Sequence, residues 1–179
     1  MPRIHILGAS GSGTSTLGAA LAARLGCPHA DSDDFFWQPT DPPYTHRRPM
    51  PERFERLREC LCGHDSWVFS GSAVSWAHPL EALYDLIVFL RLDPAVRMRR
   101  LRQREHARYG ARIAEGGDLA VENQAFLAWA EAYDEAGPLQ RSLSVHEAWL
   151  AEIHCPVLRL DSAHPVEKLI AAVMAAIST

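Results

Sequence analysis

Lysine is nearly absent from this sequence of 179 residues. Lys168 is the only one, although lysine and arginine together number 18, so arginine carries nearly all of the positive charge. The net charge of −4 also excludes a general electrostatic attraction to nucleic acid or to an anionic membrane. We therefore expect neither as a partner, and any binding of an anion must be the property of one local site.

Cysteines and long apolar runs are also scarce. Four irregularly spaced cysteines are too few for a disulfide framework: Cys27, Cys60, Cys62 and Cys155. Cys60 and Cys62 lie in a helical pattern that points them to different faces, which argues against a zinc site with His64. No run approaches the ~20 apolar residues that span a bilayer, and the N-terminal residues MPRIHIL lack the apolar core of a signal peptide. We expect a cytoplasmic protein.

Short apolar runs alternate with helical patterns along the chain. Strands are expected at 3–7, 28–30, 67–70, 85–92 and 156–160, and helices at 15–25, 52–63, 94–104, 119–136, 142–153 and 166–177. The run 86–90 has no polar alternation, as in a strand covered on both faces. This alternation predicts one α/β domain over residues 1–179, a three-layer α/β/α sandwich with a central parallel sheet of about five strands.

The segment GASGSGTST, residues 8–16, has the glycine spacing of a Walker A loop, G-x-x-x-x-G-K-[ST], between an expected strand and helix. Glycines let successive backbone N–H groups point at phosphate oxygens, and the helix N-terminus favours an anion. The spacing does not fit the dinucleotide motif G-x-G-x-x-G. The loop predicts binding of ATP, or another nucleoside triphosphate, with Mg²⁺. The expected contacts are Gly8, Ser10, Gly11, Ser12, Gly13, Thr14, Ser15 and Thr16, with the Ser15 hydroxyl at the metal.

Position 14, where the motif has lysine, is threonine. The lysine reaches along the β- and γ-phosphates, and one hydrogen bond of this charged kind contributes ~1.5–3 kcal/mol. Threonine is uncharged and too short to reach as far. We therefore expect weakened phosphate binding, and we expect an arginine to supply the missing charge.

The layout of the whole chain resembles the nucleoside-monophosphate (adenylate) kinase and shikimate kinase group of P-loop kinases. Four segments carry the resemblance: the loop 8–16, the acidic cluster 31–33, the basic segment 97–112 and the segment 161–165. It implies transfer of the γ-phosphoryl group of ATP to a small-molecule or nucleotide acceptor. It also implies a LID-like segment near 105–118, an acceptor-binding arm near 35–60 and an adenine loop at 161–165.

The resemblance to shikimate kinase also implies roles for single residues. Asp31 becomes an outer-shell magnesium ligand, and Asp33 becomes a contact or base for the acceptor hydroxyl, unless the cluster is a solvated acidic turn that caps a helix. LID arginines in this group stack on adenine and close over phosphates. We therefore assign Arg100 to the nucleotide and Arg104, Arg108 and Arg112 to catalysis, with a solvated helix face as the alternative for each.

The acceptor itself cannot be read from the sequence. Tyr44, His46, Arg47 and Arg48 lie in the expected arm, where paired arginines suit a carboxylate or a phosphate. Thr14 also leaves two other functions open, a non-catalytic nucleotide sensor and a weak nucleotide hydrolase. We expect a monomer or a homodimer.

Overall fold

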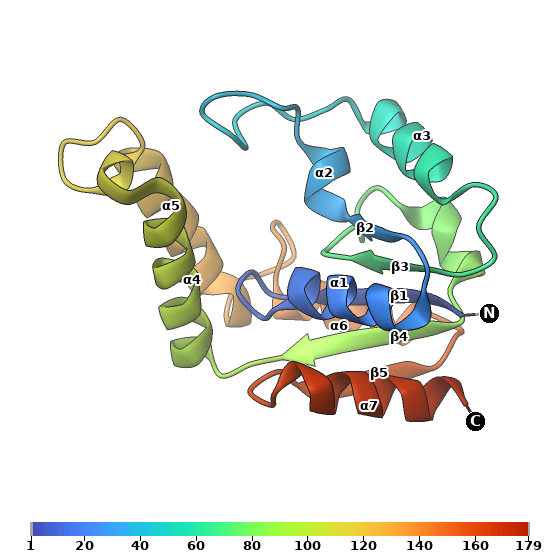
Figure 1. Ribbon diagram of the computed structural model, residues 1–179. Coiled ribbons are helices and arrows are strands. Elements are labelled where there is room, and N and C mark those ends of the chain that lie inside the picture. Colours follow the sequence, from blue (N-terminus) through green and yellow to red (C-terminus); the bar gives the residue numbers. More distant parts are fainter. Residues whose placement is uncertain (1, 179) are drawn as a thin grey trace.

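A sheet of five parallel strands forms the centre of the molecule, in the order β2-β3-β1-β4-β5 (Figure 1). The computed structural model describes residues 2–178. The strands are β1 (Arg3–Gly8), β2 (His29–Asp31), β3 (Trp67–Ser70), β4 (Leu86–Arg91) and β5 (Val157–Asp161). Because all five are parallel, their carboxyl ends lie along one edge of the sheet.

Helices cover both faces of this sheet. The α-helices are α1 (Thr14–Leu25), α2 (Ser32–Phe36), α3 (Met50–Leu61), α4 (Pro94–Tyr109), α5 (Ala120–Glu131), α6 (Leu143–Glu152) and α7 (Val166–Ile177). Three 3₁₀ segments are η1 (His78–Leu83), η2 (Gly110–Ile113) and η3 (Ala132–Asp134). Within residues 2–178, no helix combines the length and the apolar character needed to cross a membrane.

Alternate side chains of the strands enter two separate cores. Ile6 and Val88 pack with α1 and α7 on one face, whereas Phe69 and Phe89 pack with α3, α6 and η1 on the other. This period of two is the geometry of an extended strand, and it explains why residues 86–90 of the central strand β4 are all apolar. The predicted three-layer α/β/α fold is confirmed.

The helix expected at 94–104 continues for about one more turn. Helix α4 continues to Tyr109 and ends at Gly110, the first residue after it with a positive φ, 52°. Arg104 and Arg108 therefore lie on a helix, and only residues 110–118 of the predicted LID segment lie beyond it. The single helix expected at 119–136 is likewise divided into α5 and η3.

The arm between α2 and α3 is held by Arg48, one of the residues that lie in the expected acceptor-binding arm. Arg48 is 8% exposed, donates to the carbonyl oxygens of Phe35 and Trp37, and forms an ion pair with Glu52 at 2.9 Å. These contacts occupy the guanidinium group. The Arg48 side chain therefore turns inward and fixes the backbone of the arm.

A buried histidine makes the sheet sensitive to acid. His5 on β1 is 1% exposed, stacks against Phe69 and Tyr84 with ring centroids 4.9 Å away in both cases, and donates from Nδ1 to the Phe69 carbonyl oxygen at 3.1 Å. Burial lowers the pKa of His5 to about 4. The unfolded chain takes up this proton near the ordinary histidine value, so the folded state loses stability as the pH falls from about 6.5 towards 4.

We predict that His5→Phe flattens this dependence, because phenylalanine keeps the ring stack and does not titrate. Each pH unit corresponds to at most about 1.4 kcal/mol for one such group, so the difference in unfolding free energy between pH 7 and pH 4.5 should shrink by about 2 kcal/mol. Urea unfolding followed by circular dichroism measures it. The exposed His64 is the matched control, and His64→Gln should keep the wild-type dependence. An equal pH dependence in His5→Phe and wild type would contradict the prediction.

Candidate functional site

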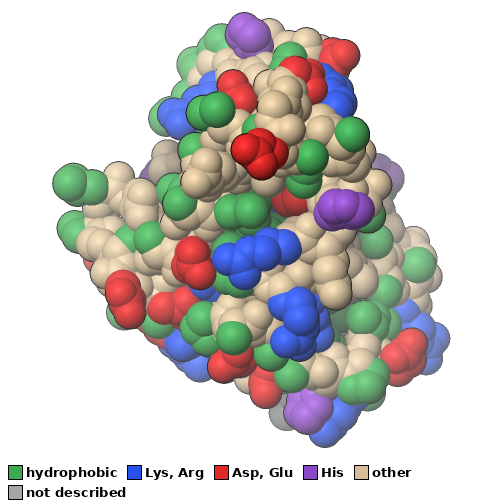
Figure 2. All heavy atoms as spheres, turned by 90° about the vertical axis from the view of Figure 1, so that its left-hand side faces the viewer, with side chains coloured by type: hydrophobic (Ala, Val, Ile, Leu, Met, Phe, Trp, Pro, Cys, Tyr) green, Lys and Arg blue, Asp and Glu red, His purple; other side chains and the backbone are tan. Residues whose placement is uncertain are grey.

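A cavity of about 770 Å³ lies at the carboxyl ends of the strands. It is bounded by the glycine loop, by the ends of β2 and β3, by α4 and by the segment after β5. Figure 1 shows α4 and α5 standing beyond this edge of the sheet, with the arm between α2 and α3 on the same side. Figure 2 looks onto that side, where basic side chains gather near the middle of the face and acidic ones surround them.

The glycine loop is built for close approach of a ligand. Gly11 and Gly13 have φ values of 84° and 90°, in the left-handed region that favours glycine. Gly13 lines the cavity, and a Cβ built on it meets no protein atom within 4 Å, so the space before it is open. Among residues 2–178, no side chain caps helix α1, which begins at Thr14. The amide groups of its first turn are therefore left for a ligand.

The structure brings together all of the expected loop residues and both carboxylates. The cavity is lined by Gly8, Ser10, Gly11, Ser12, Gly13, Thr14, Ser15 and Thr16, together with Asp31 and Asp33. The hydroxyl oxygen of Ser12 is buried, and no hydrogen-bond partner for it lies in the described part of the chain. Such an orphaned polar group in a cavity wall indicates a polar ligand.

A chain of hydrogen bonds fixes Asp31. Ser70, at the end of β3, donates to Asp31 Oδ2 at 3.0 Å, and the His29 ring nitrogen Nε2 lies 2.9 Å from the same hydroxyl oxygen. Since the Ser70 proton is used on Asp31, Nε2 is the donor in the second bond. Asp31 Oδ1 accepts from the Asp33 backbone N–H at 3.1 Å and thereby caps α2. The acidic cluster 31–33 therefore caps a helix, which was the alternative to a role in the site, and it also lines the cavity.

Asp33 differs from Asp31 because its carboxylate accepts no hydrogen bond from the described residues. Among the described residues, no hydrogen-bond donor or ion-pair partner lies within bonding distance of it. Burial, followed by the negative charge of Asp31, raises the pKa of Asp33, and the positive charges of Arg141 and Arg104 oppose this rise. A carboxylate with a raised pKa at a cavity wall is suited to accept a proton.

The expected arginines divide into two groups. Arg100, Arg104 and Arg108 line the cavity from α4. Arg100 donates to the Ser162 carbonyl oxygen at 3.1 Å, which ties α4 to the segment expected to be the adenine loop. Arg104 pairs with its neighbour Glu105 at 2.8 Å.

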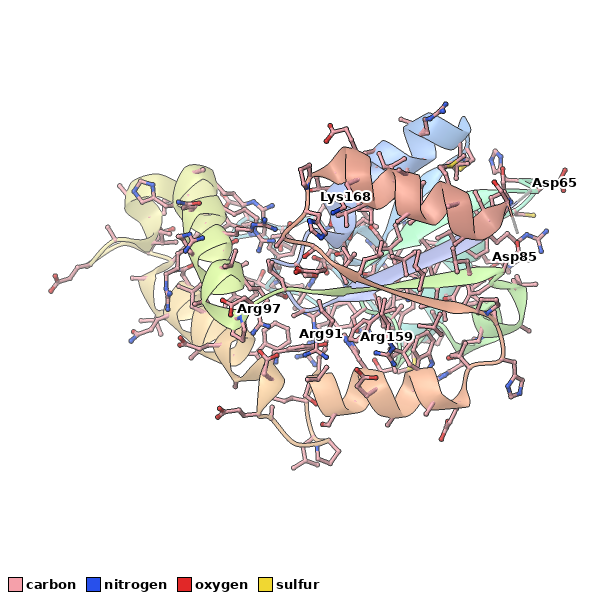
Figure 3. All side chains as sticks on the ribbon, turned by 90° about the horizontal axis from the view of Figure 1, so that it is seen from below. Asp65, Asp85, Arg91, Arg97, Arg159 and Lys168 are labelled. Carbon is pink, nitrogen blue, oxygen red and sulfur yellow. The ribbon has the colours of Figure 1, made fainter. Side chains whose placement is uncertain are left out.

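Arg112 is not brought to the cavity. It lies on η2 and forms ion pairs with Asp118 at 2.7 Å and Asp41 at 3.2 Å. Its catalytic role stays a prediction. Its guanidinium group is bound by two carboxylates at the surface. Arg97, which shares a helical stripe with Arg100 and Arg104, is 1% exposed and pairs with Asp134 at 2.8 Å (Figure 3).

One residue of the cavity wall, Arg141, was missed from the sequence. Arg141 lines the cavity and donates to the Ser10 hydroxyl. Ser72 lines it as well, and its hydroxyl lies 2.8 Å from His146 Nε2, while the other ring nitrogen lies 2.8 Å from the Tyr133 hydroxyl. Burial lowers the pKa of His146 to about 3, so this ring is neutral. The one local signal for Arg141 is its place before Ser142, a typical N-cap residue.

Comparison with known proteins agrees with this geometry. Residues 4–124 match the family model described as an AAA domain. The chain is 44% identical over 158 residues to the uncharacterized protein YqaC of Bacillus subtilis (strain 168), which covers 88% of this chain and 87% of that protein.

Two solved structures share the fold. A shikimate kinase from Bacteroides thetaiotaomicron superposes with a TM-score of 0.55 at 19% identity and covers 99% of each chain. A gluconokinase from Sinorhizobium meliloti 1021 gives 0.53 at 18% identity, covering 99% of this chain and 91% of that one. The match over residues 4–124 shows that this chain belongs to the AAA domain family, and its parallel sheet with the glycine loop after β1 gives it a P-loop kinase-like fold.

Proposed function

We propose that this protein transfers the γ-phosphoryl group of ATP to a small acceptor that bears a hydroxyl or a phosphate. The observation that carries the proposal is one cavity in which an open glycine loop, the carboxylate of Asp33 and arginines of α4 meet. Phosphoryl transfer requires little covalent chemistry from a protein and depends on positioning and on positive charge around the phosphates. The walls of this cavity offer both.

The residues also fit magnesium that arrives with the nucleotide. Ser15 and Asp31 provide hard oxygen donors on one cavity wall. In the described chain, no three His, Cys, Asp or Glu side chains cluster as a metal cage. Mg²⁺ commonly binds through one or two carboxylates together with substrate phosphates and water, so a complete protein cage is not needed. When bound, the ion would neutralise charge between the β- and γ-phosphates.

Asp33 is the proposed base for a hydroxyl acceptor. The bond between the γ-phosphorus and the β–γ bridging oxygen breaks as the acceptor oxygen forms its bond to phosphorus. The acceptor proton passes to the Asp33 carboxylate, and ADP leaves. Because the pKa of Asp33 is raised, its affinity for this proton is greater than that of an aspartate with the ordinary pKa.

One observation favours two other functions. Thr14 leaves the loop without its own cation, as in a protein that binds a nucleotide without transferring phosphate, or one that hydrolyses it slowly. Incubation with Mg·ATP and a panel of acceptors, namely shikimate, gluconate, simple sugars and nucleoside monophosphates, separates the three by ³¹P NMR. A kinase gives a new phosphate ester and ADP, a hydrolase gives inorganic phosphate without an acceptor, and a sensor gives no product while calorimetry shows binding.

Gly13→Val should abolish ATP binding, because the new side chain would occupy the open space before the loop. The matched control is Gly26→Val at the other end of α1, where φ is also positive, 66°, and where the space is also open. Both variants carry similar backbone strain. Only Gly13→Val should lose ATP binding by calorimetry, and unchanged affinity in the folded variant would contradict the loop assignment.

Ser15→Ala and Asp31→Asn should weaken ATP binding only when magnesium is present. Loss of a ligand or an outer-shell partner commonly lowers metal affinity by about 10- to 100-fold, and a fall of this size is expected in both variants. The exposed Asp34 does not line the cavity, so Asp34→Asn is the control for lost negative charge. Calorimetry with Mg²⁺ and then with EDTA tests the idea. Equal losses under both conditions would contradict it.

Asp33→Asn should leave ATP affinity within about twofold and lower turnover by about 10²- to 10⁴-fold, the usual contribution of a general base. Wild-type turnover should fall as the pH drops through the raised pKa of Asp33, since the protonated carboxyl cannot accept a proton. The residual activity of Asp33→Asn should lack this fall. Steady-state rates between pH 4.5 and 8 measure it, and an acid limb retained in the variant would assign the titration to another group.

A further inference from the structure

We propose that Arg141 supplies the positive charge that Thr14 leaves out of the phosphate loop, so that its guanidinium contacts the β- and γ-phosphates. This inference rests on the proposed function and names a residue of the same site. Arg141 lies between η3 and α6, outside the segment 97–112 that the sequence favoured.

The position of Arg141 is fixed on three sides. Its Nη2 donates to the hydroxyl of Ser10 in the glycine loop. Its guanidinium carbon lies 4.5 Å from the centroid of the Trp129 ring, and this stacking orients the plane of the group. Ser142, the next residue, caps α6 by accepting from the Val145 N–H. A planar cation that is held at the loop in this way can meet two phosphate oxygens with little loss of freedom.

Arg141 is also short of partners. Its Nε is buried and has no hydrogen-bond partner in the part of the chain described here. Arg97, Arg104 and Arg112 each form an ion pair, but none of the ion pairs found in residues 2–178 includes Arg141. A guanidinium has five N–H donors, so most of its capacity is left for a ligand. A partly buried cation beside a phosphate loop with unfilled donors is suited to an anion.

The other cations are less well placed for this task. Arg100 is bonded to Ser162 and Arg108 to the Tyr44 hydroxyl, both at the sides of the cavity. Lys168 lies on α7, its Nζ is 3.4 Å from His164 Nε2, and it does not line the cavity (Figure 3). Among the hydrogen bonds of the described residues, Arg141 alone of these cations reaches the glycine loop.

The test is whether a lysine restored to the loop can replace Arg141. Calorimetry would compare Arg141→Met, Thr14→Lys and the double variant for binding of Mg·ATP and of inorganic tripolyphosphate. Arg141→Met should weaken both by about 10- to 100-fold, the value of one charged hydrogen bond. Thr14→Lys should restore most of this loss in the double variant, and it should strengthen binding much less in the wild-type background, where Arg141 already supplies the charge. Arg102→Met, at an exposed arginine outside the cavity, should behave as wild type.

A double variant that binds tripolyphosphate no better than Arg141→Met, while Thr14→Lys alone binds it much more tightly than wild type, would overturn the proposal. So would an Arg141→Met protein in which only the KM for the acceptor changes. A protein that loses ATP binding with Arg141 but transfers phosphate to no acceptor would end the kinase proposal and support this one. If Arg141→Met bound ATP and transferred phosphate as well as wild type, the kinase proposal would stand and the proposed role of Arg141 would be overturned.

A second measurement leaves Arg141 intact, in case its substitution prevents folding. Phosphates that engage the guanidinium should change the fluorescence of the tryptophan beneath it. Adding Mg·ATP should therefore alter the emission of wild type and of Trp76→Phe but not of Trp129→Phe. A change that persists in Trp129→Phe, at equal ATP affinity, would count against contact through Arg141.

Discussion

The position of β1 between β3 and β4 is the constraint on which the site depends. Because β1 is central, the loop that follows it emerges in the middle of the sheet edge and has neighbours on both sides. On one side, Asp31 and Ser70 end the adjacent pair of strands and are bonded to each other. On the other side, β4 leads into α4 and its arginines. Carboxylates and cations thus meet across one phosphate loop, as expected at the carboxyl edge of a parallel sheet.

Much of this could be predicted because it is local in the sequence. Strand β4 is an unbroken apolar run of the length of a strand, and the loop's glycines lie directly between a strand and a helix. Each signal depends on a few adjacent residues and on the steric rules of the backbone. The same reasoning located Asp31 and Asp33, since Asp31 is the last residue of β2 and Asp33 lies two residues after it.

The rest could not be predicted because it depends on contacts between distant segments. Arg97, Arg100 and Arg104 share a helical stripe, so periodicity treats them alike, yet Asp134 holds Arg97 in the interior while Arg100 and Arg104 line the cavity. The structural role of Arg48 was not predicted for the same reason, since the carbonyl oxygens that it binds become neighbours only when the arm folds back. Arg141 lies 131 residues from Ser10, and no local pattern records their contact.

The guanidinium group of Arg141 and a lysine in the loop would be held in position by different parts of the fold. A lysine at position 14 would be placed by the loop and by the first turn of α1. Arg141 is placed instead by Trp129 on α5 and by the cap of α6, so the charge at the phosphates depends on the packing of these helices around η3. Arg97 stabilises the same region through its bonds to Asp134 and to the Ala130 carbonyl oxygen. If Arg141 binds the phosphates as proposed, phosphate affinity is coupled to the packing of α4, α5 and η3. The ion pair between Arg97 and Asp134 then affects the site without touching a ligand.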